Sequence, residues 1–222
     1  MKKITIVIDG PAGSGKSTVS QKLAKKLGYT YLDSGALYRS IALKASHKKV
    51  KSQNSQQLYR LCKNSIIAFK KKEGKQHVFL DHKDITQKIR TRKISLLASL
   101  YSKLPVVRKA LLYQQQKLGK KGGMVAEGRD LGTVVFPKAE LKFFLIASLK
   151  ERAKRRYLEL KEKFKKISLR HIEKEIQKRD KEDSKRALAP LKKAKDAISL
   201  DTTSLTIDQV VSRMYKEFLK RV

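Results

Sequence analysis

Apolar residues form a short run near the start of the chain and then recur at helical spacing. The segment Lys3–Ile8 is rich in β-branched residues and stops at Asp9, which is typical of a buried parallel strand that enters a loop. Beyond the loop, apolar positions recur every three or four residues, and Gly28 follows the last of them. This pattern predicts a helix over Gly15–Leu27 with Gly28 at its C-terminal end.

The alternation of strand and helix continues, which favours an α/β fold. Tyr31-Leu32 predicts a short strand, and a helix follows from Ser34 through Ala45. Between residues 50 and 100 the pattern changes to short strands between helical stretches, and we interpret this region as a small inserted subdomain. Its expected strands are Ser65–Lys70, Gln76–Leu80 and Lys83–Thr86, with a turn at Glu73-Gly74.

The rest of the chain resumes the alternation of helices and strands. Expected helices are Arg92–Lys103, Pro105–Leu118, Lys150–Lys163, Leu169–Lys185 and Ile207–Lys220, and expected strands are Met124–Glu127, Lys142–Leu149 and Ala197–Leu200. No long linker interrupts this order. The prediction is one α/β domain over residues 1–222, with a central parallel sheet flanked by helices.

Composition narrows the classes of protein that fit. The 222 residues include 54 Lys+Arg and 20 Asp+Glu, a net charge of +34, which indicates an anionic partner: nucleic acid, a membrane surface or small acidic substrates. A hydrophobic fraction of 40% excludes disorder of the whole chain, and no apolar run approaches the roughly 18 residues of a membrane span. The single cysteine, Cys62, allows no internal disulfide and is interpreted as a small buried hydrophobe.

The loop after the first strand carries a phosphate-binding motif. Residues 10–17 fit G-x-x-x-x-G-K-[ST] between a strand and a helix, which is the context that this motif requires. Backbone N–H groups from Ala12 to Lys16 are expected to converge on the β-phosphate of a nucleoside triphosphate, with Lys16 bridging the β- and γ-phosphates. Ser17 supplies a hydroxyl ligand for Mg²⁺. The donor-binding set is Gly10, Pro11, Ala12, Gly13, Ser14, Gly15, Lys16, Ser17 and Thr18.

Three further segments carry residues that suit an anionic acceptor. Asp33–Arg39 follows the second strand and Glu127–Thr133 ends another, so both lie near carboxyl ends of the sheet, where open α/β folds bind ligands. Arg179, Asp183 and Arg186 are spaced i, i+4 and i+7, which predicts one face of one helix. Together these segments predict an anion-binding cleft.

Four sequence blocks resemble the bacterial cytidylate kinases. They are Gly10–Thr18, Leu32–Arg39, Gly128–Pro137 and Arg179–Leu191, and their order and spacing agree with that family over nearly the whole chain. The resemblance implies a nucleoside monophosphate kinase fold, with residues 50–100 as the inserted acceptor-binding subdomain and residues 150–168 as a helical lid. It also implies phosphoryl transfer from ATP to CMP or dCMP.

The resemblance assigns roles to individual residues. Those expected to bind the acceptor nucleotide are Ser34, Arg39, Ser99, Arg108, Arg129, Asp130, Arg179, Asp183 and Arg186. Those expected to act in transfer are Lys16, Arg129 and the lid residues Arg152, Arg155 and Arg156. Three positions depart from the family pattern: Glu127 stands where many relatives have Asp, and Lys181-Glu182 replaces a more usual Asp-Arg pair.

The chemistry of cytosine agrees with this assignment. Cytosine presents acceptors at O2 and N3 beside an amino donor, so an arginine and a carboxylate form a complementary pair, here Arg108 and Asp130. Arg39 and Arg129 suit the acceptor phosphate, and Asp183 suits a ribose hydroxyl. We expect a cytoplasmic monomer that uses Mg²⁺ and ATP and has no membrane or specific nucleic-acid partner.

Two alternatives stay open from the residues alone. One is a P-loop kinase for another small acceptor, which steady turnover with CMP but none with UMP, AMP or shikimate would separate. The other is a basic RNA-binding protein with a regulatory nucleotide site. The sequence offers no recognisable RNA module or aromatic platform in its support.

Overall fold

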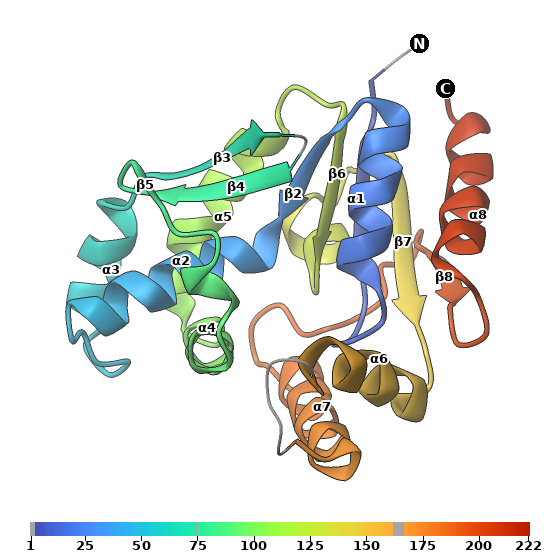
Figure 1. Ribbon diagram of the computed structural model, residues 1–222. Coiled ribbons are helices and arrows are strands. Elements are labelled where there is room, and N and C mark those ends of the chain that lie inside the picture. The colour runs from blue at the N-terminus through green and yellow to red at the C-terminus, as the bar shows by residue number, and fades with distance from the viewer. Residues whose placement is uncertain (1–2, 74, 162–166) are drawn as a thin grey trace. The chain divides into compact units, whose positions relative to one another are not determined.

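The chain is a mixed α/β protein made of two compact units (Figure 1). A computed structural model describes residues 3–73, 75–161 and 167–222. One unit comprises Met1–Tyr31 and Lys121–Val222, and the other comprises Leu32–Lys120. Among the described residues, no helix has the length and apolar character needed to cross a membrane.

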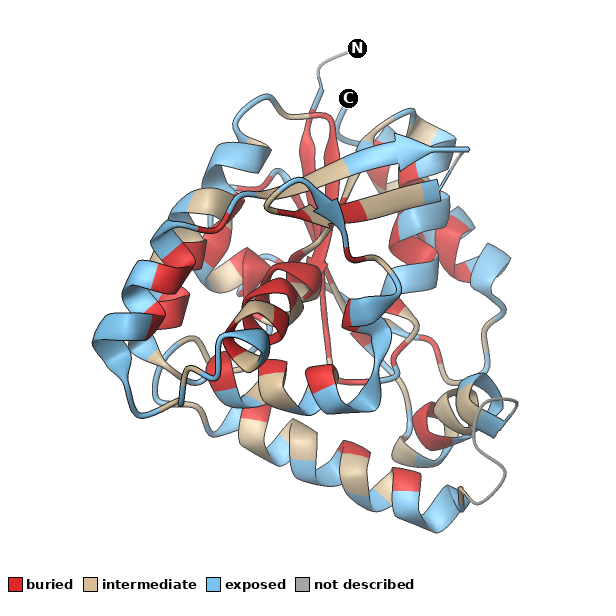
Figure 2. Ribbon diagram, turned by 60° about the vertical axis from the view of Figure 1, so that its left-hand side comes forward, coloured by how far each residue is buried: buried red, intermediate tan, exposed pale blue. Residues whose placement is uncertain are grey.

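A parallel sheet with strand order β2-β6-β1-β7-β8 lies mainly in the first unit, whose boundary after Tyr31 falls within β2. The strands are β1 (Thr5–Asp9), β2 (Thr30–Asp33), β6 (Met124–Gly128), β7 (Leu141–Ile146) and β8 (Ile198–Asp201). Strand β1 pairs in parallel with both β6 and β7. Strands β1 and β6 are buried at every position, as the red strands of Figure 2 show. The predicted α/β fold with a central parallel sheet is confirmed, and burial on both faces explains the continuous apolar run in β1.

In the described part of the first unit, the α-helices that accompany this sheet are α1 (Lys16–Leu27), α6 (Leu149–Lys161), α7 (Leu169–Ser184) and α8 (Ile207–Leu219). Apolar residues of α1 and α8 share one core with the strands, and the two helices lie side by side in Figure 1. Gly28 ends α1 in the left-handed conformation with φ 65°, as predicted. Helix α8 begins with a capping box between Thr206 and Gln209.

The second unit combines helices with a small antiparallel sheet. Its elements are α2 (Ser34–His47), α3 (Ser55–Lys63), β3 (Ile67–Lys72), β4 (Lys75–Leu80), β5 (Lys83–Asp84), a 3₁₀ turn at Lys88–Arg90, α4 (Arg92–Tyr101) and α5 (Pro105–Gly119). Its core joins Ile41 of α2, Leu58 of α3, Val78 of β4 and Leu111 of α5. Because α2 and α5 contribute to this core, the unit extends on both sides of the insert expected over residues 50–100.

Several predicted boundaries are wrong by two or three residues, each for a local reason. Strand β3 begins at Ile67, because the hydroxyl of Ser65 donates to the Leu61 carbonyl and continues the end of α3. Strand β5 stops at Asp84, whose carboxylate accepts from Thr86 in a turn. Strand β7 ends at Ile146 and α6 already includes Leu149, since an apolar run does not distinguish a strand end from the first turn of a helix.

One element of the structure was not predicted, and some predicted positions are not described. The sequence does not predict the π-helical turn Leu131–Val135, here η2, which follows β6. Gly74 of the predicted hairpin turn, and residues 162–163 at the predicted end of the helix after β7, lie outside the described residues.

Cys62 is fully buried in the core of the second unit. Burial raises the pKa of its thiol to about 11, so the thiol stays protonated at neutral pH. The prediction of a small buried hydrophobe is confirmed, and this cysteine has none of the thiolate character that a nucleophile needs.

Gly10 marks the closest approach between the end of β1 and its neighbour β7. Its φ is +149°, and a Cβ placed there would lie 2.2 Å from the carbonyl oxygen of Leu145. Gly28, which also has a positive φ, has no atom within 4 Å of the corresponding position. Gly10 is therefore required both by its backbone conformation and by lack of space for a side chain, whereas Gly28 is required by its conformation alone.

We expect Gly10→Ala to lower the free energy of unfolding by about 3 kcal/mol or more, because the added methyl group collides with backbone and the residue keeps a strained φ. Gly28→Ala should cost only about 1 kcal/mol, the conformational part alone. Urea denaturation of both variants measures the difference. Equal losses would contradict the close approach at Gly10.

Candidate functional site

The topology of the parallel sheet brings three loops of the first unit to one edge. Asp9 at the end of β1 is in register with Gly128 at the end of β6, and also with Phe144 near the end of β7. The segments that follow these strands, residues 10–18, 129–135 and 147–161, therefore begin at the same carboxyl edge. This is where open α/β folds bind ligands.

The loop after β1 leads directly into helix α1 and presents its positive end. Gly15 is the N-cap residue, and neither a side-chain cap nor an acidic residue in the first turn neutralises this end. Ala12 and Gly13 form a turn before this end of the helix, and the amide of Ala12 donates to Oδ1 of Asp180 at 3.1 Å. A ring of backbone donors at a helix N-terminus is suited to a phosphate group.

Lys16 is buried inside this loop. Its ammonium Nζ donates to the Pro11 carbonyl at 2.6 Å and to the Ser14 hydroxyl at 3.1 Å. Burial first, and the nearby Arg129 guanidinium second, hold the pKa of Lys16 well below its usual value. Ser17 and Thr18, in contrast, are exposed at the first turn of α1.

Asp9 connects the end of β1 with the π-helical turn η2 after β6. Its two carboxylate oxygens accept the amides of Leu131 at 3.0 Å and Gly132 at 2.8 Å. Burial raises the pKa of Asp9 to about 6, although both amides and Lys16 act in the opposite direction. The carboxylate thus holds the backbone just after Arg129 and Asp130, both of which were predicted site residues.

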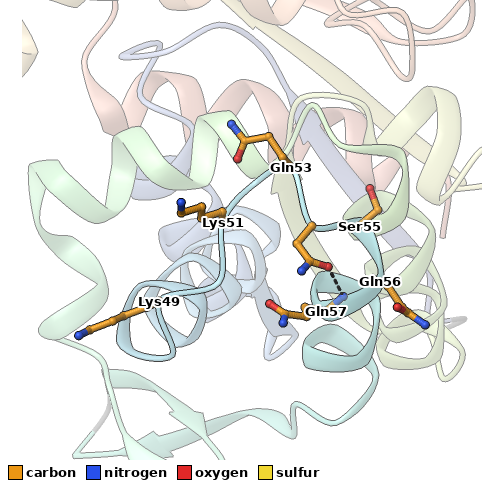
Figure 3. A pocket seen from close by; sticks show the side chains of 7 residues that line it. Lys49, Lys51, Gln53, Ser55, Gln56 and Gln57 are labelled. Atoms are coloured by element: carbon orange, nitrogen blue, oxygen red, sulfur yellow. Dashed lines mark hydrogen bonds between the residues drawn. The ribbon is translucent and has the colours of Figure 1, made fainter.

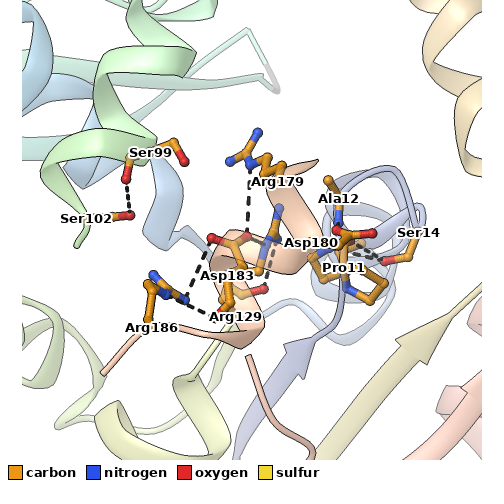
Figure 4. Close-up of polar contacts among 12 residues, drawn as sticks. Pro11, Ala12, Ser14, Ser99, Ser102, Arg129, Arg179, Asp180, Asp183 and Arg186 are labelled. Atoms are coloured by element: carbon orange, nitrogen blue, oxygen red, sulfur yellow. Dashed lines mark hydrogen bonds and ion pairs between the residues drawn. The ribbon is translucent and has the colours of Figure 1, made fainter. Parts of the chain in front are cut away.

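Asp183 of α7 is the centre of a cluster of arginines in the first unit (Figure 4). Its Oδ2 accepts from Nε of Arg129 at 3.0 Å, and Arg179 and Arg186 each place a guanidinium nitrogen 4.0 Å from the carboxylate. The three cations hold the pKa of Asp183 below its usual value, even though burial raises it. The structure therefore brings together Arg129, Arg179, Asp183 and Arg186, as the sequence predicts.

The location of Arg186 on one helix face with Arg179 is wrong. Helix α7 ends at Ser184, and Lys185 is its C-cap residue, so Arg186 lies beyond the helix. Its Nε donates to the main-chain carbonyl of Asp183 at 3.3 Å, which turns the side chain back toward the carboxylate. The i+7 spacing correctly predicted that Arg186 lies near Asp183, but the turn after α7, and not the helix face, brings the two together.

Two clusters of predicted site residues lie within the second unit. Arg39 pairs with Asp33, with 2.6 Å between Nη2 and Oδ2, while its Nε is buried and has no hydrogen-bond partner among the described residues. Asp33 also caps α2 by accepting from the amide of Ala36. Ser34 is buried as the first residue of α2. An unsatisfied guanidinium donor of this kind is suited to an anionic ligand.

The second cluster surrounds Arg108 of α5, which is buried. Its Nη1 donates to the Ser102 carbonyl at 3.0 Å, and its guanidinium lies 5.7 Å from the ring centroid of Tyr38. The Ser102 hydroxyl donates to the carbonyl of Ser99 at 2.8 Å (Figure 4). The predicted residues Ser99 and Arg108 are thus connected through Ser102.

The three arginines predicted in the lid have different surroundings. Arg152 is buried and bonds the Ala147 and Ala12 carbonyls and the Asp180 carboxylate. Arg155 bonds Glu151 and both oxygens of Thr202, and its Nη1 lies 3.7 Å from a Cβ position built on Gly15. Arg156 pairs with Glu159 on the helix surface, with 42% of its side chain exposed. Of the lid expected over 150–168, residues 162–166 lie outside the described residues.

Sequence reasoning missed five residues of these clusters. They are Asp9, Tyr38, Ser102, Tyr31, whose hydroxyl donates to the carboxylate of Glu127, and Asp180, which pairs with Arg152. Asp9 and Asp180 offered a signal, because Asp9 directly precedes the Gly10–Thr18 block and Asp180 lies inside the Arg179–Leu191 block of a strongly basic chain. Ser102 and Tyr38 offered none, because their partners depend on tertiary contacts.

A surface pocket of the second unit does not coincide with any of these clusters. It lies in and before the first turn of α3 and contains none of the predicted site residues (Figure 3). The residues that line it are Lys49, Lys51, Gln53, Asn54, Ser55, Gln56 and Gln57.

The fold and the phosphate-binding loop define a P-loop nucleotide-binding protein, and the arginines at the same sheet edge are typical of a P-loop kinase. The family model described as cytidylate kinase matches residues 6–220. The chain therefore belongs to the cytidylate kinase family and is a kinase. The alternative of an RNA-binding protein is not favoured.

Similar proteins agree with this family. A cytidylate kinase of Caldicellulosiruptor saccharolyticus is 49% identical over 220 residues, which cover 99% of this chain and 97% of the relative. A cytidylate kinase of Syntrophotalea carbinolica is 46% identical over 220 residues, with 99% and 94% covered. A solved shikimate kinase of Bacteroides thetaiotaomicron shares the fold, with a TM-score of 0.50, 11% identity and 99% of each chain covered.

The raised pKa of Asp9 predicts how stability depends on pH. The folded state binds the proton more tightly than the unfolded chain, whose pKa is 3.8, so ionisation between pH about 4 and about 6 opposes folding. Relative to Asp9→Asn, the free energy of unfolding of the wild-type protein should therefore fall by about 2 kcal/mol as the pH rises from about 4 to about 6.5. Denaturant titrations at both pH values measure this difference, and a constant difference would contradict the shift.

Proposed function

We propose how this chain carries out the reaction of its family, the transfer of the γ-phosphoryl group of ATP to CMP or dCMP. The donor is held by Gly10–Thr18. The residues that we assign to the acceptor are Ser34, Arg39, Ser99, Arg108, Arg129, Asp130, Arg179, Asp183 and Arg186. The observation that carries the proposal is the common sheet edge, where the P-loop follows β1 and Arg129-Asp130 follow the adjacent β6.

The donor role rests on the chemistry of the loop. Backbone amides at the start of α1 and the positive end of that helix attract the phosphates. Lys16 moves its ammonium from the Pro11 carbonyl and the Ser14 hydroxyl onto the β- and γ-phosphates. A lysine that is buried among neutral acceptors gains more from a dianionic ligand than an exposed one would.

The acceptor role divides among charged residues according to the parts of CMP. Arg39 and Arg129 bind the phosphate, Asp183 accepts from a ribose hydroxyl, and Arg108 with Asp130 reads the cytosine edge. The buried Nε of Arg39 has no hydrogen-bond partner among the described residues, which supports the binding of an anionic group by this arginine. Uracil presents N3–H to the arginine and O4 to the carboxylate, which leaves buried polar groups unmatched.

No protein base is needed, because a phosphate monoester is already anionic near neutral pH. Catalysis then consists of holding donor and acceptor in line and neutralising the charge of the transferring group. Lys16 and Arg129 supply this charge in the first unit. Arg155, beside Gly15, is the lid arginine whose surroundings best suit a contact with the transferring group, whereas Arg156 remains on the helix surface.

Magnesium fits the residues at the P-loop. Mg²⁺ keeps several waters and binds through substrate phosphates and one or two protein oxygens. The exposed hydroxyl of Ser17 offers one such oxygen, and no cluster of three His, Cys, Asp or Glu in the described part of the chain could hold a metal by itself. The metal would neutralise phosphate charge while bound to ATP and Ser17.

The remaining expectations complete the proposal. We place the protein in the cytoplasm as a monomer, with small nucleotides rather than a specific nucleic acid as its partners. A single buried cysteine supports a reducing compartment, since no disulfide stabilises the fold. The net charge of +34 supports attraction of polyphosphate substrates over the whole surface.

Lys16→Ala tests the donor site. The variant should keep the fold and lower kcat by at least about 100-fold, because it removes a preorganised charge from the transferring group. A coupled assay of ADP formation, together with circular dichroism, provides the measurement. Near wild-type turnover by a folded variant would contradict the role of the P-loop.

Asp130→Asn tests the reading of the base. An amide can turn its NH₂ toward uracil O4, so CMP should lose more than UMP, and the CMP:UMP ratio of kcat/KM should fall about 10-fold or more. Arg108 still opposes uracil N3–H, so inversion is not expected. If both nucleotides weaken equally at fixed Mg-ATP, Asp130 does not read the base.

A further inference from the structure

We infer that Asp180 and Arg152 form a brace that positions the P-loop relative to the acceptor-binding residues of α7. Both are positioning residues in this view. The inference concerns contacts within the first unit alone, and it rests on the proposed function for what the P-loop and α7 bind.

The brace holds both backbone polar groups of Ala12. Asp180 accepts the Ala12 amide at 3.1 Å, and Nη1 of Arg152 donates to the Ala12 carbonyl at 3.0 Å. The same guanidinium pairs with Asp180, and its Nε donates to the Ala147 carbonyl at 3.0 Å. Figure 4 shows Asp180 pointing from α7 toward Pro11 and Ala12. The peptide groups on either side of Ala12 therefore have fixed orientations.

Apolar contacts converge on the same point of the loop. The methyl group of Ala12 packs with Ala153 of α6 and with Ile172 and Ile176 of α7. A Cβ on Gly13 would lie 3.0 Å from the carbonyl oxygen of Arg152, so the backbone of α6 rests directly against the loop. Helices α6 and α7 are thus attached to the P-loop by packing as well as by charge.

The brace connects this loop with the acceptor cluster through one helix. Asp180 follows Arg179 in the sequence and lies one helical turn before Asp183, which bonds Arg129. A shift of the P-loop therefore moves α7 and the carboxylate at the centre of the arginine cluster. Donor and acceptor residues keep one spacing while this brace is intact, and in-line transfer depends on that spacing.

The carboxylate is specifically suited to this position. It accepts from an amide N–H on one oxygen and from a guanidinium on the other, and it has no donor of its own. An asparagine of the same shape would direct its NH₂ toward one of the two donors. Its loss of charge would also leave Arg152 buried without its anion.

Asp180→Asn and Arg152→Lys, singly and combined, test the brace. Glu173→Gln is the matched control, since it removes one carboxylate from α7 with no contact to the P-loop among the described residues. Isothermal titration gives Kd for Mg-ADP, steady-state kinetics give KM for Mg-ATP and CMP, and thermal unfolding gives the folded fraction.

We expect Asp180→Asn to raise Kd for Mg-ADP and both KM values about 10-fold, the effect of one charge-assisted contact, while Glu173→Gln stays within about 2-fold. Because the two residues act together, the Kd and KM values of the double variant should be only slightly higher than those of the more impaired single variant. If Asp180→Asn fails to fold, Arg152→Lys carries the same expectation, because lysine keeps the charge but cannot reach three acceptors.

Unchanged Kd and KM values with only a lower folded fraction would overturn the brace, since a merely structural defect reduces active protein without altering substrate binding. Additive losses in the double variant would overturn it as well. Failure of the proposed function gives a different result. The wild-type protein would then not convert CMP, but the Kd values for Mg-ADP would still show whether the variants weaken the P-loop.

Discussion

Charge compensation at the carboxyl edge of the parallel sheet is the constraint on which the site depends. A buried cation is costly unless an anion and hydrogen bonds accompany it. The first unit pairs the buried Arg152 with Asp180 and the half-buried Arg129 with Asp183, and it places the Asp9 carboxylate near the buried Lys16 without a direct bond. Two of these carboxylates also accept backbone amides, so the groups that balance charge fix the course of the loops.

Nucleotide substrates add further negative charges to this set of cations and carboxylates. The protein alone places the ammonium of Lys16 on a carbonyl and a hydroxyl, which are neutral partners. The guanidinium of Arg129 already has Asp183 as its anion. A phosphate therefore gains most at Lys16, where no carboxylate bonds the cation directly, and least where a protein carboxylate must first be displaced.

Local sequence signals predicted most of the fold. In β1, α1 and α8 the spacing of apolar residues matches the residues that each element buries. The P-loop was equally predictable, since its chemistry is local. Tertiary contacts were not predictable. The partner of Arg152 is Asp180, 28 residues away, and Asp9 accepts two amides of η2, the segment that follows the adjacent strand β6. Arg186 is an intermediate case: its spacing predicted that it lies near Asp183, but it did not predict that the helix ends before it.

The distinction between lysine and arginine explains how one strongly basic chain separates general attraction from precise positioning. A lysine ammonium is a strongly hydrated point charge, and lysines on the surface create a field that attracts polyanions without fixing them. A guanidinium donates in several fixed directions. Arg152 reaches two carbonyls and a carboxylate, and Arg155 reaches Glu151 and both oxygens of Thr202. Lysine at either position would keep the net charge of +34 and lose this geometry, so the arginines rather than the net charge fix the directions of these contacts.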